Sequence, residues 1–384
     1  MLYAYRFGCV SGNISKFRFL RLAASLSSKR YATTSPNLAR LPHILNSKIV
    51  AGSAVLTGSY FLYIWLTDDD IVPSGYPKTL EATTFRRLPL NTVSYFVGLF
   101  GNVNIPRPLR SPIFGLYVRL TGCKMEEAQQ DQISEYSTLR ELFTRQLRSD
   151  CRNVDQYAVL TSPADGTVLY TGPVEETTNQ LFQVKGVNYS MDEFLGPTET
   201  FRTQEAIRKK KKLGLYQCVI YLAPGDYHRF HTPTDWTITT RRHFPGKLLS
   251  VRPSFMARLP GLFALNERVV YLGHWKHGFM SFTAVGATIV GSIRVEADSS
   301  LCTNEPKRSS LGLPSYRHLK EAPAAFREVA LANTDGGLKV KKGEAFGYFQ
   351  LGSTIVLIFE APLEGFEWKV RAGDRIQYGM PLIT

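Results

Sequence analysis

The pattern of hydrophobic and polar positions predicts a chain that is mostly β in its second half. From Ala158 onward, short runs of Val, Ile, Thr, Tyr and Phe alternate with turn residues, which is typical of strands. The predicted strands are Thr167–Thr171, Gln217–Leu222, Trp236–Thr240, Arg268–Leu272, Phe279–Ala284, Thr288–Val295 and Thr354–Phe359. Many short strands with little helix between them indicate a mostly β (α+β) fold, with a compact sandwich or barrel-like main domain.

Residues 87–148, which precede this β region, are expected to be helical. Two stretches, Leu90–Phe100 and Ile113–Leu120, are apolar with few polar interruptions, and a Pro- and Arg-rich segment at 106–110 separates them. Two short apolar helices either lie in a membrane surface or cover one edge of the core. The two interpretations are compatible if one face of each helix contacts the membrane and the opposite face packs on the core.

A third apolar stretch lies further upstream. Ile49–Leu66 is free of charge over 18 residues and is followed by three aspartates. At a rise of 1.5 Å per residue, a helix of this length spans about 27 Å, just enough for the hydrocarbon core of a bilayer. Three aromatic residues gather at its C-terminal end, as at a membrane interface. We predict a transmembrane helix over 49–66 and a linker over 67–86. A buried soluble helix is the alternative, because two glycines lower the helix propensity.

The charge of the chain is unevenly distributed. The formal net charge is +14, but residues 1–67 hold eight basic and no acidic residues, so 38 basic against 32 acidic residues remain elsewhere, or +6. An Arg- and Ser-rich, acid-free N-terminus is typical of a mitochondrial transit peptide. We expect it to span residues 1–31, with processing after Tyr31; a disordered basic tail is the alternative. Residues 32–48 would then face the matrix, and the large domain the intermembrane space.

Two other classes of site are not indicated. The five cysteines form no CxxC pair and have no His partner at metal spacing, so we expect no metal. The basic run at 208–212 has no interleaved aromatic residues and no recognisable binding fold around it, so we expect no nucleic-acid partner. The run is expected to be a solvated loop. Attraction to an anionic lipid surface is the alternative, since each basic residue there contributes roughly 1 kcal/mol.

Four residues are candidates for chemistry: Asp165, His228, His231 and Ser353. A serine hydroxyl is a poor nucleophile until a base takes its proton, and a histidine base needs a carboxylate to orient it. Spacing alone cannot bring such distant residues together, and a hydrogen-bonded core histidine is the ordinary interpretation of either His. The two histidines lie three residues apart, so they point to opposite faces in a strand and can share one face in a helical turn.

Three dispersed motifs carry a resemblance to a known family. The segment Tyr221–Trp236 resembles the signature of the phosphatidylserine decarboxylases, particularly their mitochondrial branch. Ser162–Gly166 resembles the aspartate motif of that family, and Leu351–Thr354 resembles its processing motif. Lesser matches lie at Phe143–Leu147, His243–Leu248, Asn266–Val269 and Val285–Ile293. The similarity covers about residues 85–384 in the family's order. A Gly-Ser-Thr motif alone would be weak evidence for the family. Three motifs in the family's order are specific evidence for it.

The resemblance implies that the chain cuts itself. His231 would act as the base on Ser353, with Asp165 orienting it, and the activated hydroxyl would attack the carbonyl of Gly352. β-Elimination would then release a β chain that ends at Gly352. The α chain of 32 residues, 353–384, would begin with a pyruvoyl group made from Ser353. The resemblance also implies that the two chains remain associated and that no metal is needed.

The activity implied is the decarboxylation of phosphatidylserine in a membrane. The pyruvoyl carbonyl would form a Schiff base with the amine of the lipid, and loss of CO2 would lead to phosphatidylethanolamine. His228 is the implied candidate for the decarboxylation step, and the division of labour between His228 and His231 stays open. One alternative is a lipid serine hydrolase without self-cleavage, although Ser353 lacks the Gly-x-Ser-x-Gly elbow. Another is a non-enzymatic, membrane-tethered β module, suggested by a hammerhead-like glycine pattern near the C-terminus.

Overall fold

The computed structural model describes residues 90–384, except 175–179, 185–186, 198–207, 209, 289–291, 306, 309–313, 316–325, 332–335 and 351. All of the described residues belong to the second of two compact units, Asp68–Thr384. The predicted transit peptide, matrix-side segment, transmembrane helix and linker lie outside the described residues. Within the described part of the chain, no helix is both long and apolar enough to cross a membrane.

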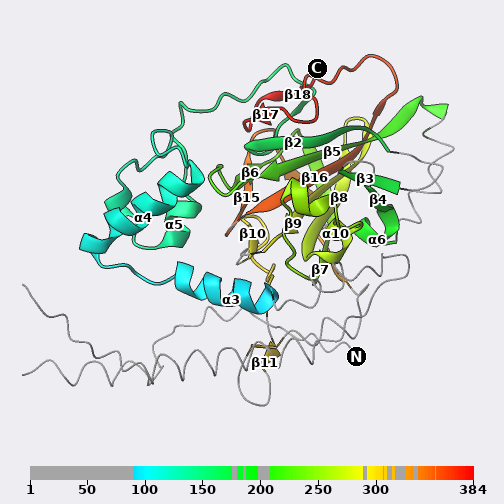
Figure 1. Cartoon of the computed structure of the whole chain (residues 1–384). Helices are drawn as coiled ribbons and strands as arrows, with labels where there is room; N and C mark the ends of the chain where they lie inside the picture. The colour runs from blue at the N-terminus through cyan, green and yellow to red at the C-terminus, as the bar shows by residue number, and fades with distance from the viewer. Residues whose placement is uncertain are drawn as a thin grey trace, which may run out of the picture. The chain divides into compact units, whose positions relative to one another are not determined.

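The N-terminal part of the described chain is helical over part of the predicted range 87–148 (cyan in Figure 1). Its elements are α3 (Leu90–Gly101), α4 (Arg107–Thr121), the 3-10 turn η2 (Ile133–Glu135) and α5 (Leu139–Phe143). Helix α4 begins at Arg107, earlier than the predicted apolar stretch, because proline is well tolerated in the first turn of a helix. The side chain of Thr138 caps α5 by accepting a hydrogen bond from Glu141 N.

The centre of the structure is a nine-stranded sheet of antiparallel neighbours. Its order is β13-β7-β8-β9-β16-β5-β2-β17, and β14 also pairs with β7. The strands are β2 (Gly166–Pro173), β5 (Leu213–Leu222), β7 (Trp236–Phe244), β8 (Arg268–Trp275), β9 (Gly278–Gly286), β13 (Arg327–Ala330), β14 (Leu338–Val340), β16 (Ser353–Pro362) and β17 (Arg375–Ile376). Six of the seven predicted strands lie in this sheet, which confirms them. The mostly β fold class is likewise confirmed.

A second sheet packs on one face of the first. It contains β10 (Ile293–Val295), β15 (Ala345–Phe349) and β6 (Arg229–His231) in the order β10-β15-β6. Phe230 and Phe346 of this sheet contact Phe282 of β9, at centroid distances of 5.4 and 5.2 Å. The two sheets therefore enclose one apolar core, as in a sandwich. The strand predicted at Thr288–Val295 is too long, since Thr288 lies in a turn and β10 begins at Ile293.

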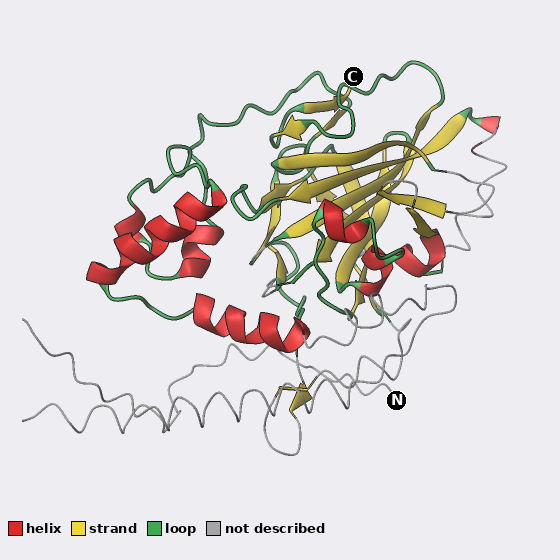
Figure 2. Cartoon of the chain, viewed as in Figure 1, coloured by secondary structure: helices red, strands yellow, loops and turns green. Residues whose placement is uncertain are grey.

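Short elements cover the other face of the large sheet, as Figure 2 shows in red and yellow. They are the hairpin β3 (Gln180–Val184) and β4 (Val187–Ser190), with α6 (Met191–Leu195), α9 (Pro253–Met256) and α10 (Leu262–Leu265). The remaining pairs are β1 (Leu160–Thr161) with β18 (Pro381–Ile383), and β11 (Lys307–Arg308) with β12 (Pro314–Ser315). Both faces of the large sheet are thus buried.

Strand β16 lies in the middle of the large sheet, between β5 and β9. It pairs with β5 over its whole length and with β9 from Ser353 to Phe359. Because side chains alternate between the faces of a strand, Ile355 and Leu357 enter the core between the two sheets, whereas Val356 and Ile358 enter the other core. By the same alternation, Ser353 faces the layer that contains β6.

The basic run at 208–212 is not a uniformly solvated loop. Arg208 is buried and lies 3.7 Å from Glu360 of β16 in an ion pair. Lys210, Lys211 and Lys212 are exposed. Among the described residues of the run, these three lysines retain the predicted solvated character, and the alternative of a lipid surface still applies to them.

Candidate active site

Ser353 is the first residue of β16, and its side chain is fully buried. Its backbone pairs with Leu222 on one side and Gly286 on the other, so its position is fixed from both neighbouring strands. Within the part of the chain that the structure describes, its Oγ atom has no hydrogen-bond partner. A buried hydroxyl without a partner costs about 1–3 kcal/mol. The structure therefore retains a rigidly held serine hydroxyl whose hydrogen-bonding capacity is unused.

Gly352 precedes this serine in an unusual backbone conformation. Its φ of +32° lies in the region that residues with side chains rarely adopt. A Cβ atom placed on Gly352 would meet no other atom within 4 Å. The restriction at this position is thus conformational rather than steric, and there is open space beside the Gly352–Ser353 bond.

Asn266 supports the strand next to Ser353. Its side-chain amide donates hydrogen bonds of 2.8 Å to the carbonyls of Leu249 and Gly286, and its Oδ1 accepts a hydrogen bond of 3.0 Å from Leu249 N. Gly286 N in turn donates to the carbonyl of Glu267. These bonds fix Gly286, and through it the backbone of Ser353.

His228 lies immediately before β6 and is completely buried. Its Nδ1 lies 2.8 Å from the carbonyl oxygen of Asp226. Because a carbonyl only accepts, Nδ1 carries the proton and Nε2 carries a lone pair. That Nε2 has no hydrogen-bond partner among the residues described, and the ring packs at 4.1 Å on Phe143 of α5. Burial lowers the pKa of His228 to about 4. His228 is therefore a neutral imidazole with an unused basic nitrogen at pH 7.

Two backbone junctions connect His228 with the region of Ser353. Ser353 pairs with Leu222, and Phe349 N donates a hydrogen bond of 3.0 Å to the carbonyl of His228. The segments 222–228 and 349–353 therefore run between the same two junctions. Four residues of extended chain span at most about 14 Å, which is the upper limit on the backbone distance from Phe349 to Ser353.

His231 lies in β6 and has a different environment. Its Nδ1 is 3.1 Å from the carbonyl oxygen of Gly343, and its Nε2 is 3.2 Å from the hydroxyl of Tyr227. Nδ1 therefore donates to the carbonyl, and Nε2 accepts from Tyr227. The ring stacks on Tyr378 at 3.8 Å. Burial lowers the pKa of His231 to about 4. Both ring nitrogens of His231 are thus already hydrogen-bonded.

Asp165 ends a turn immediately before β2. Its carboxylate accepts hydrogen bonds from Arg152, at 2.5 Å from Nη2 and 3.3 Å from Nε. Arg152 also pairs with Glu127 at 2.7 Å, and Tyr378 N donates to Asp165 at 2.8 Å. Burial raises the pKa of Asp165, while the bonds from Arg152 and Tyr378 act in the opposite direction. Arg152 is therefore the cation that opposes the effect of burial on the pKa of this carboxyl.

The structure brings the aspartate turn and the histidine strand side by side. His231 N donates a hydrogen bond of 2.7 Å to the carbonyl of Pro163, and Tyr378 contacts both Asp165, through its N–H, and His231, through its ring. Among the described residues, no hydrogen bond joins Asp165 to His231 or His231 to Ser353. The roles expected for these residues therefore stay predictions.

Arg152, Tyr227 and Tyr378 are parts of this site that the sequence did not reveal. Tyr227 lies within the quoted signature, next to His228, and only the fold shows that its hydroxyl reaches His231. Burial of Asp165 requires a cation, but nothing in the spacing distinguishes Arg152 from other basic residues. No group of three or more His, Cys, Asp and Glu side chains within the described residues is arranged to hold a metal ion.

Comparison with known proteins decides the family. The sequence profile of the phosphatidylserine decarboxylase family matches residues 139–384. The mitochondrial phosphatidylserine decarboxylase proenzyme of Rattus norvegicus is 42% identical over 325 residues, which cover 81% of this chain and 76% of the relative. The chain belongs to the phosphatidylserine decarboxylase family. The mitochondrial proenzyme of Caenorhabditis elegans is 39% identical over 88% of this chain and 82% of its own length, and mitochondrial proenzyme 1 of Saccharomyces cerevisiae is 34% identical over 78% and 73%.

Membership of the phosphatidylserine decarboxylase family gives the lesser matches in the sequence a structural meaning. Phe143, from the first of them, packs on His228. Asn266 and Gly286, from two others, are joined by a hydrogen bond next to Ser353. These segments surround the residues of the three main motifs without belonging to them.

Proposed function

We propose that this chain is a mitochondrial phosphatidylserine decarboxylase, made as a precursor that cuts its own Gly352–Ser353 bond. The observation that carries the proposal is the state of Ser353: its hydroxyl is buried and unpaired, at the start of a strand held from both sides. The relatives' names add that they are proenzymes and mitochondrial. The products of the mature enzyme are phosphatidylethanolamine and CO2.

Self-cleavage requires only groups of this chain and water. Oγ of Ser353 attacks the carbonyl carbon of Gly352, so that a C–O ester bond replaces the C–N bond and the nitrogen becomes a free amine. Loss of the Cα proton of Ser353 then expels the carboxylate of Gly352, which becomes the end of the β chain. Water replaces the nitrogen, which leaves as ammonia, and a pyruvoyl group remains at position 353. Gly352 adopts its left-handed φ at little cost because it has no Cβ, so the chain can turn sharply at the bond that is cut.

A base must remove the proton of Ser353, and we assign this role to His231, with Asp165 orienting it. His231 then has to exchange the hydroxyl of Tyr227 for that of Ser353. Asp165 stabilises the imidazolium that forms, as carboxylates do in catalytic triads. His228, whose Nε2 is unpaired without any exchange, is the second candidate for the same step.

A pyruvoyl group at position 353 would supply an electrophilic carbonyl that accepts the electrons released as CO2 leaves. The residues present fit such a group, since the side chain it replaces has no hydrogen-bond partner to lose. His228 is neutral at pH 7 because burial lowers its pKa to about 4, so a proton taken up by its Nε2 would readily be returned to the product carbon. Burial of His228 against Phe143 excludes water from this step.

The α chain, residues 353–384, is proposed to remain bound after cleavage. Its first strand, β16, lies between β5 and β9 in the middle of the large sheet, and β17 and β18 pair with β2 and β1. Arg375 of the α chain also forms an ion pair of 2.5 Å with Asp226. Removal of the α chain would require the large sheet to come apart, which supports permanent association.

The membrane is proposed to contact the outer faces of α3 and α4. Phe100 is 73% exposed and Leu120 is 76% exposed, and the other exposed apolar residues nearby are Leu99, Val103, Leu109, Ile113 and Leu116. The opposite face of α4 is buried through Phe114. An exposed apolar patch of this kind is typical of a membrane or protein interface, and a two-chain lipid substrate favours the membrane.

The proposed location is the inner mitochondrial membrane, with the catalytic domain in the intermembrane space. It rests on the predicted transit peptide at 1–31, the predicted transmembrane helix at 49–66, and the naming of the relatives as mitochondrial. Immunoblots of protease-treated mitochondria and of mitoplasts measure the orientation. The domain should be degraded only after the outer membrane has been opened.

Intact-mass analysis tests the proposed maturation. The purified protein should contain an α chain that begins with a carbonyl-bearing residue at position 353, and Ser353→Ala should leave one uncut chain. Ser281→Ala is a matched control, because it removes another buried, unpaired hydroxyl from the neighbouring strand β9. An active enzyme with an intact Gly352–Ser353 bond would exclude self-cleavage and favour an ordinary lipid hydrolase.

Single substitutions test the division of labour between the histidines. Asp165→Ala and His231→Ala should block self-cleavage, whereas His228→Ala should still cleave and should lose decarboxylation. The fraction of α chain on a gel measures the first property, and CO2 release from phosphatidylserine measures the second. Normal self-cleavage in His231→Ala, with none in His228→Ala, would transfer the role of base to His228.

A further inference from the structure

The chain between β5 and β6 turns at residues 223–226, on its way from the partner of Ser353 to His228. Leu222, the last residue of β5, pairs with Ser353. At the other end, Phe349 N donates a hydrogen bond of 3.0 Å to the carbonyl of His228. Both ends of the turn are therefore held by the segment that carries the proposed cleavage site.

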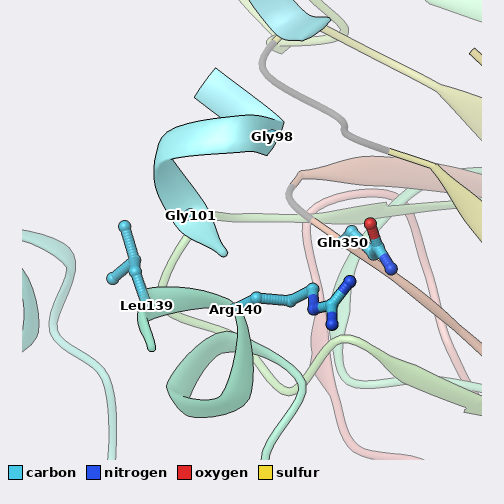
Figure 3. Close-up of a pocket in the computed structure, with 5 residues that line it drawn as sticks. All are labelled: Gly98, Gly101, Leu139, Arg140 and Gln350. Atoms are coloured by element: carbon cyan, nitrogen blue, oxygen red, sulfur yellow. The ribbon is translucent and has the colours of Figure 1, made fainter. Parts of the chain in front are cut away.

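Helix α5 holds the ring of His228 from another side. Phe143 packs on this ring at 4.1 Å between centroids, and Gln350, next to the junction with His228, lines a small hollow together with two residues of α5 (Figure 3). Such packing restricts the plane of the imidazole. It does not decide which nitrogen carries the proton, because the two tautomers have the same shape. The hydrogen-bond partner of Nδ1 decides that.

Asp226 supplies the partner of Nδ1 and also closes the turn. Its carbonyl accepts the hydrogen bond of 2.8 Å from His228. Its carboxylate accepts a hydrogen bond of 2.7 Å from Ala223 N, and its own N–H donates to the carbonyl of Ala223 at 2.9 Å. The hydroxyl of Tyr117 donates to the carbonyl of Pro224 at 2.7 Å. The position of the Asp226 carbonyl therefore depends on the Asp226 side chain, which fastens the two ends of the turn to each other.

Arg375 neutralises the carboxylate of Asp226. Nη2 and Nη1 of Arg375 donate to the two carboxylate oxygens at 2.5 and 3.1 Å, and bidentate bonds of this kind are among the strong ones in proteins. The Asp226 side chain is only 10% exposed, and a carboxylate removed from water is costly unless it is paired. Arg375 lies in β17, in the part that becomes the α chain, whereas Asp226 lies in the β chain. The ion pair therefore joins the two chains of the proposed mature enzyme.

We propose that Asp226 and Arg375 are positioning residues for decarboxylation and that they act through the tautomer of His228. The inference rests on the proposed function, in which Nε2 of His228 returns a proton to the product carbon. The ion pair holds the turn, and the turn holds the Asp226 carbonyl where it accepts from Nδ1. The proton of the neutral imidazole stays on Nδ1, so Nε2 keeps the lone pair that takes up the proton. The α chain thus contributes Arg375 to the reaction, in addition to the group at position 353.

Steady-state kinetics of the mature enzyme test this role. Arg375→Gln removes the charge, and Asp226→Asn keeps an acceptor for Ala223 N but loses the ion pair. Complete loss of the correct tautomer in a catalytic triad costs about 10⁴-fold in rate. Since Tyr117 still holds the turn, each variant should lower kcat, counted per α chain, by about tenfold on phosphatidylserine vesicles and leave KM within about twofold. The double variant should also lose about tenfold, because both substitutions remove the same interaction.

Two variants serve as controls. Glu367→Gln breaks an exposed ion pair with Lys369 elsewhere in the α chain and should behave like the wild type. Arg375→Lys keeps the charge and should recover most of kcat. The Arg375 side chain is 59% exposed, so its replacement should leave the fold intact, and a Tm close to that of the wild type would show this.

The 15N chemical shifts of the imidazole measure the tautomer itself. In the uncut Ser353→Ala protein at pH 7, Nδ1 of His228 should be protonated. Arg375→Gln and Asp226→Asn should both shift the signals toward the Nε2-protonated form, and His228→Gln identifies these signals by their loss. An unchanged tautomer in both variants would overturn the proposal even if kcat falls, because the pair would then act only through stability.

Failure of the proposed function would give a different result. CO2 release by His228→Ala at the wild-type rate would remove His228 from decarboxylation, and the positioning role with it. A His228→Ala enzyme that releases no CO2, with Asp226→Asn and Arg375→Gln at the wild-type kcat, would refute only the positioning pair. Self-cleavage should be normal in both variants, because His231 is assigned as its base. Formation of α chain that falls together with kcat would show a general structural role, and the positioning pair would again be refuted.

Discussion

Removal of the Arg152 charge is the perturbation whose effect the structure determines best. The Arg152 side chain is 3% exposed and binds two carboxylates, Asp165 at 2.5 Å and Glu127 at 2.7 Å. Arg152→Gln keeps most of the side-chain volume and leaves both carboxylates without their cation. Arg148→Gln is the matched control, because Arg148 is exposed and pairs with the exposed Asp150.

The expected loss of stability follows from the burial of this group. Removal of one partner from a buried ion pair costs about 3–5 kcal/mol, since the remaining charge is left uncompensated. At about 2–4 °C per kcal/mol for a unit of this size, the Tm of Arg152→Gln should fall by roughly 10 °C. Surface pairs contribute about 0–1 kcal/mol, so Arg148→Gln should change the Tm by no more than a few degrees.

The same substitution should alter the pH dependence of self-cleavage. Burial already raises the pKa of Asp165, and the hydrogen bonds from Arg152 oppose that rise. Without them the pKa rises further, so the carboxyl is protonated over a wider range, and a protonated Asp165 cannot stabilise the imidazolium of His231. Self-cleavage of Arg152→Gln should therefore be slow at pH 7 and recover as the pH rises.

A pulse of synthesis, followed by gels of the α chain at several pH values below the melting temperature, measures the rate. The reasoning is refuted if Arg152→Gln cuts itself at the wild-type rate with an unchanged pH profile. Faster cleavage would also refute it, because Arg152 would then be withholding Asp165 from His231 rather than keeping it ionised.

Three further predictions concern the same region. Gly352→Ala should slow self-cleavage on gels and cost about 1–2 kcal/mol, because its φ of +32° disfavours a side chain; an unchanged rate would contradict this. The pKa values of His228 and His231 fall from 6.5 to about 4 on folding, so the free energy of unfolding should decrease as the pH falls from 6.5 toward 4, by up to about 1.4 kcal/mol per pH unit for each histidine. Urea titrations measure this slope, which replacement of both by Gln should flatten. Asn266→Ala loses three buried hydrogen bonds and should lower the free energy of unfolding, measured by urea titration, by about 3 kcal/mol, with slower self-cleavage because Gly286 is less firmly held.

Six of the nine strands of the large sheet were predictable from the chain alone, whereas the short strands β13, β14 and β17 were not predicted. Each predicted run, such as Gln217–Leu222 or Thr354–Phe359, is dense in β-branched and aromatic residues, and that composition is a local property. Their boundaries were less accurate, because the ends of a strand depend on its neighbours. Thr288 is β-prone, yet it lies in a turn, because no strand pairs with it there.

The candidate residues were identified only through motifs whose types and order resemble a family. Asp165, His228, His231 and Ser353 stand out in this way, and the profile match confirms the family. Their hydrogen-bond partners did not stand out. Tyr378 is 213 residues from Asp165, and Gly343 is 112 residues from His231, and no local pattern encodes such pairs.

What the sequence determined by itself is the class of the fold, the order of its strands along the chain and the types of residue available for chemistry. Only the tertiary structure decided which side-chain atoms of these residues have hydrogen-bond partners. It gave Asp165 to Arg152 and Tyr378, gave both nitrogens of His231 to partners, and left Oγ of Ser353 and Nε2 of His228 unpaired. The physical reason is that local composition sets strand propensity and burial, whereas hydrogen-bond partners depend on the spatial order of the strands. In this sheet β16 lies between β9 and β5, an order that differs from their sequence in the chain.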